Sequence, residues 1–169
     1  MPEVRIVHDF ACDAGTFWDR LFFDDEYNRR LFLDALRFPV WRVVSQAKTD
    51  AGVTRRIDIQ PLVEHVPGPI KRLLGDRFGY SEQVTFDRAS GRYRFTITPS
   101  VMPDKIRIEG QLYLAPAGPK KTRRVVETRV EVKVFAVGRM IEEKTIADMK
   151  ASYEKAAAFT NEFLNEKGL

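Results

Sequence analysis

The chain has 169 residues, of which 44% are hydrophobic, and its formal net charge is +4. This length and composition predict a single domain, residues 1–169, with enough apolar residues for a sizeable core. The modest charge, spread over both signs, argues against a nucleic-acid-binding protein, and the single cysteine, Cys12, excludes an internal disulfide framework.

The N-terminal residues do not have the pattern of a signal peptide. Glu3, Arg5 and Asp9 interrupt the apolar run that such a peptide needs. No stretch of the chain reaches the roughly 18 apolar residues typical of a membrane-spanning helix. These features predict a cytoplasmic protein, and its net positive charge would allow peripheral contact with anionic membranes.

The first third of the chain predicts one strand and two short helices. Residues 3–10 alternate between apolar and polar, which is typical of a strand. Asp13 has the position of an N-cap for the first helix, which carries Phe17 on its apolar side. A change of phase at residues 24–25 indicates a break before the second helix, in which residues 28–30 are expected to face solvent.

Beyond Pro39 the period of the apolar residues changes from 3.6 to 2, which predicts strands. We expect these strands at about residues 41–48, 54–60, 78–86, 93–97, 106–114 and 126–134. The alternate positions of these strands, which would face the other side of the sheet, are mostly charged residues, Gln and Thr. One buried and one solvated face indicate an antiparallel sheet that is covered on one side only.

The last stretch, residues 137–169, predicts one long amphipathic helix. Its apolar face is unusually small, since Thr145, Ser152 and Ala156 lie among the bulkier residues. A helix that only fills a core would usually carry Leu and Ile at such positions. We therefore expect this helix to roof a cavity on the concave face of the curled sheet.

The order of these elements, the segment FWDRLFFDDEYNRRLF and the closing helix resemble the START-like (SRPBCC, birch-pollen-allergen type) helix-grip superfamily over essentially the whole chain. The stretches FFDDEYNRRLF and PGPIKRLLGDRFGYSE are similar to an uncharacterised bacterial family of START-like proteins. The resemblance implies an α+β helix-grip fold, in which a curved antiparallel sheet of about seven strands wraps around a long C-terminal helix. Two short helices follow the first strand. It also implies an internal cavity, because members of the superfamily bind sterols, phospholipids, polyketides and plant hormones, and some are enzymes.

The inward phases of the strands and of the last helix predict the residues that line this cavity and bind its ligand. They are Trp41, Arg55, Ile57, Ile59, Tyr80, Glu82, Phe95, Ile97, Ile108, Leu112, Val130, Val132, Ile141, Thr145, Met149, Ser152, Tyr153 and Ala156. Arg55 and Glu82 stand out, because buried charges are costly unless they are paired. They predict either a structural ion pair or a site for a ligand headgroup, whereas a register shift of one residue would place both in solvent.

Residues 66–75, VPGPIKRLLG, predict a single helical turn between two strands. One interpretation is a connector whose leucines cap the core. The other is a gate over the mouth of the cavity that also touches an anionic membrane, with leucines in the interface and two cations at the headgroups. The gate and membrane-contact residues would be Ile70, Lys71, Arg72, Leu73 and Leu74, together with Met102 from a neighbouring proline-bearing segment.

No catalytic, cofactor-binding or metal-ligating residues are predicted. His8 and His65 lack partners at the spacing of a triad or a metal site, and Cys12 is expected to be a small buried filler. The basic run at residues 120–124 lacks interleaved aromatics and is interpreted as a solvated turn.

We therefore predict a monomer, not an enzyme, that binds a lipid or sterol-like molecule for intracellular lipid transfer or sensing. Two alternatives stay open. One is a cyclase or aromatase-type enzyme that acts on a hydrophobic substrate in the same cavity. The other is an interaction module that has no cavity.

Overall fold

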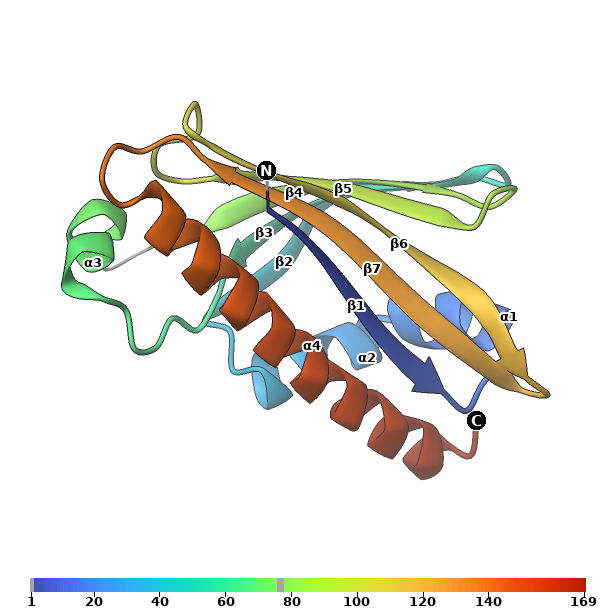
Figure 1. The fold of residues 1–169 in the computed structure, drawn as a ribbon. Helices are drawn as coiled ribbons and strands as arrows, with labels where there is room; N and C mark the ends of the chain where they lie inside the picture. The colour runs from blue at the N-terminus through green and yellow to red at the C-terminus, as the bar shows by residue number, and fades with distance from the viewer. Residues whose placement is uncertain (1, 76–77) are drawn as a thin grey trace.

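Figure 1 shows the computed structural model of the chain, which describes residues 2–75 and 78–169. Its elements are β1 (Glu3–Phe10), α1 (Ala14–Thr16), η1 (Phe17–Phe22), α2 (Asp25–Arg29), η2 (Arg30–Ala35), β2 (Val40–Lys48), β3 (Gly52–Gln60), α3 (Gly68–Leu74), β4 (Tyr80–Asp87), β5 (Arg92–Pro99), β6 (Ile106–Gly118), β7 (Lys121–Val132) and α4 (Gly138–Lys167). The two predicted short helices are α1 continued by η1 and α2 continued by η2, where η1 and η2 are wider π-type turns. The predicted order of elements is confirmed.

The seven strands form one antiparallel sheet in the order β1-β7-β6-β5-β4-β3-β2. Strands β2 to β7 follow one another as a meander, and β1 pairs with β7 to close that edge. The sheet curves, and α4 runs diagonally along it while α3 lies beyond the start of α4 (Figure 1). This arrangement is the helix-grip fold that the sequence predicts.

Strands β6 and β7 are longer than the alternation of apolar residues indicates. The predicted strands at residues 106–114 and 126–134 stop too far from the hairpin between them, because β6 continues to Gly118 and β7 already begins at Lys121. The two strands stay paired almost to their tips, with Ala115 opposite Arg123 and Pro116 opposite Thr122. Much of the basic run at residues 120–124 therefore belongs to a strand, and its side chains alternate between the two faces of the sheet.

Acidic caps begin the two short helices, as predicted for the first. The Asp13 carboxylate accepts a 2.7 Å hydrogen bond from the Thr16 amide, and the Asp24 carboxylate accepts a 2.9 Å hydrogen bond from the Tyr27 amide. Asn28 does not face solvent as expected. Its side chain is buried and donates a 3.0 Å hydrogen bond to the Phe22 carbonyl, because the break between the helices turns that carbonyl toward it.

Helix α4 packs mainly against β7, β1 and η2. Near its C-terminal end, the Thr160 hydroxyl donates a 2.6 Å hydrogen bond to the Ala156 carbonyl and so accepts the 2.7 Å hydrogen bond from the Tyr27 hydroxyl. This buried pair fixes α2 to α4. Among the described helices, none combines the length and the apolar composition that crossing a bilayer requires.

Candidate ligand-binding site

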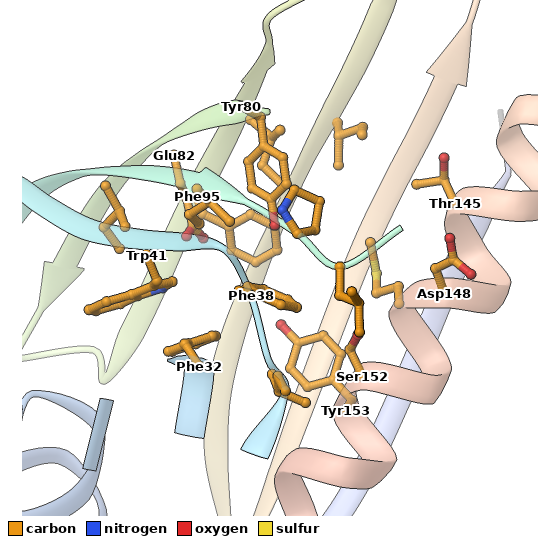
Figure 2. A pocket seen from close by; sticks show the side chains of 18 of the residues that line it. Phe32, Phe38, Trp41, Tyr80, Glu82, Phe95, Thr145, Asp148, Ser152 and Tyr153 are labelled. Atoms are coloured by element: carbon orange, nitrogen blue, oxygen red, sulfur yellow. The ribbon is translucent and has the colours of Figure 1, made fainter. Parts of the chain in front are cut away.

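A cavity of about 290 Å³ lies between the concave face of the sheet and α4. Its walls come from β2 to β7, from the short helices η1, α2 and η2, from α4, and from α3 with the segment that precedes it. Helix α4 makes its extensive contacts with β7, β1 and η2. Because it does not pack closely on the middle strands of the sheet, a space remains between them. Figure 2 shows side chains from the sheet and from α4 pointing toward this common space.

Sixteen of the eighteen residues predicted to line the cavity do so. They are Trp41, Arg55, Ile57, Ile59, Tyr80, Glu82, Phe95, Ile97, Ile108, Leu112, Ile141, Thr145, Met149, Ser152, Tyr153 and Ala156. The structure thus brings together residues from five strands and one helix. Their role in binding a ligand stays a prediction.

Val130 and Val132 do not line the cavity. Both are buried in a second apolar cluster, where they pack with Ile106 and Ile141 between the sheet and the first turns of α4. The prediction followed the correct face of β7, but α4 lies directly over this part of the strand and leaves no space there.

The small residues of α4 border the cavity, as expected. Thr145 and Ser152 lie on the side of the helix that faces it (Figure 2), and Ala156 contributes to the same wall. Tyr153 directs its hydroxyl inward from the same helix (Figure 2). A short side chain on this face leaves volume that a Leu would occupy, which explains why the helix roofs a space instead of filling it.

Arg55 and Glu82 both line the cavity, so the register that places them inward is correct. Ile57 pairs with Glu82 and Arg55 pairs with Val84, which puts the two charged residues diagonally on neighbouring strands. No salt bridge within 4.0 Å joins them, so the structural ion pair is not formed in this structure. Arg55 is 6% exposed and donates a 3.1 Å hydrogen bond to the Tyr93 hydroxyl.

Aromatic rings surround the Arg55 guanidinium. Its central carbon lies 5.1 Å from the centroid of the Phe23 ring, 5.7 Å from that of Phe22 and 5.8 Å from that of Trp41. Such rings attract a cation through their quadrupole, and the attraction grows when the cation is removed from water. The rings stabilise the charge but offer no hydrogen-bond acceptor, and Arg55 Nε has no partner in the described part of the chain.

Glu82 faces the cavity without a hydrogen-bond partner among the described residues. Burial raises the pKa of its carboxyl to about 7, and the positive charge of Arg55 opposes the rise. Burial and the negative charge of Glu82 both raise the pKa of the Tyr80 hydroxyl. Burial also raises the pKa of Tyr153 to about 12. These groups can exchange hydrogen bonds with a ligand, and Glu82 can gain or lose a proton near neutral pH.

Arg124 is a cavity residue that our reading of the sequence missed. It is 3% exposed, lines the cavity from β7 and shares a 3.0 Å hydrogen bond with His8 Nδ1. Its guanidinium lies 5.0 Å from the Tyr153 ring centroid, and burial lowers its pKa. The signal was present, since Arg124 has the same inward phase as Val126 and Thr128, but the basic run around it was interpreted as a turn.

The segment predicted as a gate forms α3 and borders the cavity. Ile70 is 1% exposed and lines the cavity together with Leu74, so Ile70 cannot reach a membrane and the expected surface role is wrong for it. Leu73 is exposed, as are Lys71 and Arg72. Met102 is partly buried against the second apolar cluster.

Further residues of the site come from segments in which the periodicity of the sequence does not specify the direction of the side chains. Phe32, Phe38 and the non-helical residues 61–63 contribute to the wall.

Phe135, in the loop before α4, is 98% exposed and was not predicted as a contact residue. An isolated aromatic in a loop between a strand and a helix was the only signal for it.

The candidate chemical groups outside the cavity are used structurally. His8 Nε2 contacts the Glu154 carboxylate at 2.9 Å, and because Nδ1 accepts from Arg124, the ring proton lies on Nε2. Cys12 is buried, and burial raises the pKa of its thiol, which is typical of an unreactive cysteine. Within residues 2–75 and 78–169, no three His, Cys, Asp or Glu side chains cluster as metal ligands do.

A family model described as "Protein of unknown function (DUF2505)" matches residues 5–164 of the chain. A search of the curated proteins finds no match. Among solved structures, the chain is similar to the Zhui aromatase/cyclase from Streptomyces sp. R1128, with a TM-score of 0.67 and 8% sequence identity. That similarity covers 99% of this chain and 96% of the other.

Two further solved structures share the fold. A START superfamily protein from Mycobacterium smegmatis has a TM-score of 0.61 and 16% identity, over 96% of this chain and 98% of that one. Norcoclaurine synthase from Thalictrum flavum, in complex with dopamine and hydroxybenzaldehyde, has a TM-score of 0.65 and 14% identity, over 97% and 87% of the two chains. These similarities confirm the START-like fold.

Proposed function

Because the chain belongs to the family described as "Protein of unknown function (DUF2505)" and has the START-like helix-grip fold, we propose that it binds one hydrophobic small molecule in its cavity. In this proposal residues 1–169 act as a single domain and a monomer in the cytoplasm, for transfer or sensing of a lipid or sterol-like ligand. The observation that carries the proposal is the cavity itself, with apolar walls and a few inward polar groups.

The driving force for binding is partition out of water. Burial of apolar ligand surface contributes about 25 cal/mol per Å². The volume of about 290 Å³ is at the lower end of the range of about 300–1,000 Å³ that is usual for small-molecule sites. A compact ligand with one chain or a few rings therefore fits better than a phospholipid with two chains.

Exchange with a membrane is proposed to occur at the end of the molecule that carries α3. Exposed Leu73 lies beside the cations Lys71 and Arg72 on α3. The fully exposed Phe135 stands in the loop before α4, and its neighbours Val134 and Val137 belong to the same apolar cluster as Ile70 of α3. Apolar side chains would enter the interface, and each cation near anionic headgroups would contribute about 1 kcal/mol. The double variant Leu73→Asp with Phe135→Asp should lose sedimentation with phosphatidylserine-containing liposomes, whereas Leu33→Asp should retain it.

A second candidate is an enzyme that acts on a hydrophobic substrate in the same cavity. The observation that favours it is Glu82, whose pKa of about 7 suits a general acid or base, beside the Tyr80 hydroxyl. The Zhui aromatase/cyclase has the same fold. An enzyme would convert its bound molecule over time, and Glu82→Gln would bind that molecule without converting it.

Native mass spectrometry of the purified protein, followed by solvent extraction, tests binding. We expect a mass above that of the chain, which denaturation releases as a small apolar molecule. A protein that is well folded, carries nothing and takes up no compound from a panel of hydrophobic molecules would contradict the proposal.

A further inference from the structure

We propose that the ligand of this cavity is a monocarboxylate with an apolar body, whose carboxylate binds at the buried guanidinium groups of Arg55 and Arg124. The inference rests on the proposed function, since it names the chemical class of the ligand for the same cavity. It starts from an imbalance of charge among the side chains that line the wall.

Both guanidinium groups are buried without a counter-ion. Arg55 is 6% exposed and Arg124 is 3% exposed. Within residues 2–75 and 78–169, no carboxylate lies within 4.0 Å of either group, although twelve salt bridges between an arginine or lysine and a carboxylate occur elsewhere in that part of the chain. Arginine does not lose its proton in proteins, so these charges cannot be removed by titration.

Each guanidinium also has unused hydrogen-bond donors. Arg55 donates through Nη2 to the Tyr93 hydroxyl, and Arg124 donates through Nη2 to His8 Nδ1. The Nε atom of each is buried and has no hydrogen-bond partner among the residues that the structure describes. Buried polar groups are almost always satisfied, so two guanidinium groups with unused donors on the wall of one cavity indicate that a ligand supplies the missing acceptor.

The two arginines belong to one polar cluster. Arg55 donates a 3.1 Å hydrogen bond to the Tyr93 hydroxyl, and the Arg124 guanidinium lies 5.0 Å from the Tyr153 ring centroid, with all four side chains on the cavity wall. The Glu82 charge acts on both tyrosines. Glu82 is the one carboxyl that acts on both tyrosines in the described part of the chain. Glu154, which His8 links to Arg124, is 75% exposed, so water screens its charge. Two fixed positive charges on the cavity wall therefore face at most one buried negative charge, and a ligand that brings one negative charge restores neutrality inside the cavity.

The chemistry of the wall favours a carboxylate. A guanidinium matches the two oxygens of a carboxylate with parallel donors, which fixes both position and orientation. A dianionic phosphate would exceed the net charge that the cluster can neutralise and would repel Glu82. The rest of the wall is mainly aliphatic and aromatic, as the apolar body of such a ligand requires.

Isothermal titration of the wild-type protein tests the class directly. Decanoate, decanol, decylamine and decyl phosphate share one apolar body and differ in the head. We expect decanoate to bind at least about tenfold more tightly than decanol, the difference that one charge-assisted hydrogen bond supplies. Decylamine should bind more weakly than decanol. A set of aromatic monocarboxylates distinguishes a chain from a ring as the apolar body, and preferred binding of either supports the proposal.

Matched variants test the assignment to the two arginines. Arg55→Gln and Arg124→Gln should each lower the affinity for decanoate by about tenfold and leave that for decanol within twofold. Their controls are Arg56→Gln and Arg123→Gln, because these neighbours point to the exposed face of the same strands and contact Asp58 and Asp9. The controls should change neither affinity.

The outcomes separate the two proposals. If decanol binds as tightly as decanoate, or decyl phosphate binds more tightly, the carboxylate inference is wrong while the binding function stands. If none of the four compounds and no aromatic acid binds, the carboxylate inference is wrong, and native mass spectrometry with the panel of hydrophobic molecules decides the binding function. If the arginine variants do not fold, the ranking of the four heads in the wild-type protein still decides.

Discussion

Lys144 of α4 donates a 2.9 Å hydrogen bond to the backbone carbonyl of Glu64, in the segment between β3 and α3. The same ammonium donates a 2.7 Å hydrogen bond to Asp148 one turn along the helix. Because Lys144 and residues 61–63 both border the cavity, this contact fastens part of the cavity wall to the helix that roofs it.

Removing the Lys144 ammonium should loosen that segment. Lys144→Met keeps the apolar stem and removes the hydrogen bond, which at this partly exposed position is worth about 1 kcal/mol, or roughly fivefold in the opening equilibrium. We expect faster hydrogen exchange at residues 62–64 and faster ligand release, with little change in global stability. Lys150→Met is the control, since that exposed lysine makes no such bond in the described chain. Unchanged exchange would show that the contact does not hold the segment.

A bulky residue at Ser152 should fill the cavity. Ser152 borders the cavity from α4 and is only partly buried, so an indole can extend into the empty volume. Ser152→Trp is expected to abolish ligand binding and to change the free energy of unfolding by less than about 1 kcal/mol, whereas overpacking a filled core costs about 1–3 kcal/mol. Ala151→Trp, on the exposed side of the helix, should retain binding.

The raised pKa of Glu82 predicts how stability depends on pH. A carboxyl with a pKa of about 7 in the folded protein, against its ordinary 4.5, holds its proton more tightly when folded. Its contribution is therefore complete below about pH 4.5 and is lost as the pH rises through about 7, a change on the order of 3 kcal/mol. The groups that act on Glu82 or sense its charge are Arg55 on β3, Tyr80 on its own strand, Tyr93 on β5 and Tyr153 on α4.

Urea denaturation across this pH range checks the prediction. Glu82→Gln should be more stable than the wild type above neutral pH and similar to it near pH 4.5, because the amide never ionises. Glu109→Gln, on the solvated face of β6 beside Arg107, should leave the pH profile unchanged. A wild-type profile identical to that of Glu82→Gln would mean that the Glu82 pKa is not raised.

The hydrogen bond between Tyr27 and Thr160 should contribute measurably to stability. Tyr27→Phe removes a buried 2.7 Å hydrogen bond that joins α2 to α4, while Thr160 keeps its bond to the Ala156 carbonyl. We expect a loss of about 0.5–1.5 kcal/mol in the free energy of unfolding. Tyr113→Phe removes a hydroxyl that makes no hydrogen bond to the described residues and should cost less. Equal losses in the two variants would contradict this role.

Periodicity alone located the sheet and the long helix, because one solvated face imposes a period of two on each strand and the helix has a single apolar stripe. It also placed Arg55 and Glu82 inward, because a strand's register fixes the side of every residue. It did not show that Val130 and Val132 lie outside the cavity, since their distance from α4 depends on how the helix crosses the sheet. Arg124 was missed for a different reason, namely that charged residues near Gly118 favour a turn more often than a buried strand.

Two aromatic residues, Phe32 and Phe135, show a further limit of prediction from the sequence. Phe32 lies in a π-type turn, where the helical period of 3.6 no longer specifies the side that a residue faces. Phe135 stands in a loop whose direction depends on where β7 ends and α4 begins. Tertiary packing decides where these side chains point, and the local sequence carries no information about that packing.

The central claim is that an apolar ligand occupies the space between the sheet and α4. Isotope-filtered NMR of the labelled protein with unlabelled decanol or decanoate measures this directly. We predict cross-relaxation between the protons of the ligand chain and the side chains of Ile57, Phe95 and Met149, which border the cavity from β3, β5 and α4. Contacts confined to exposed side chains such as Val44, or no saturable binding of either compound, would contradict the claim.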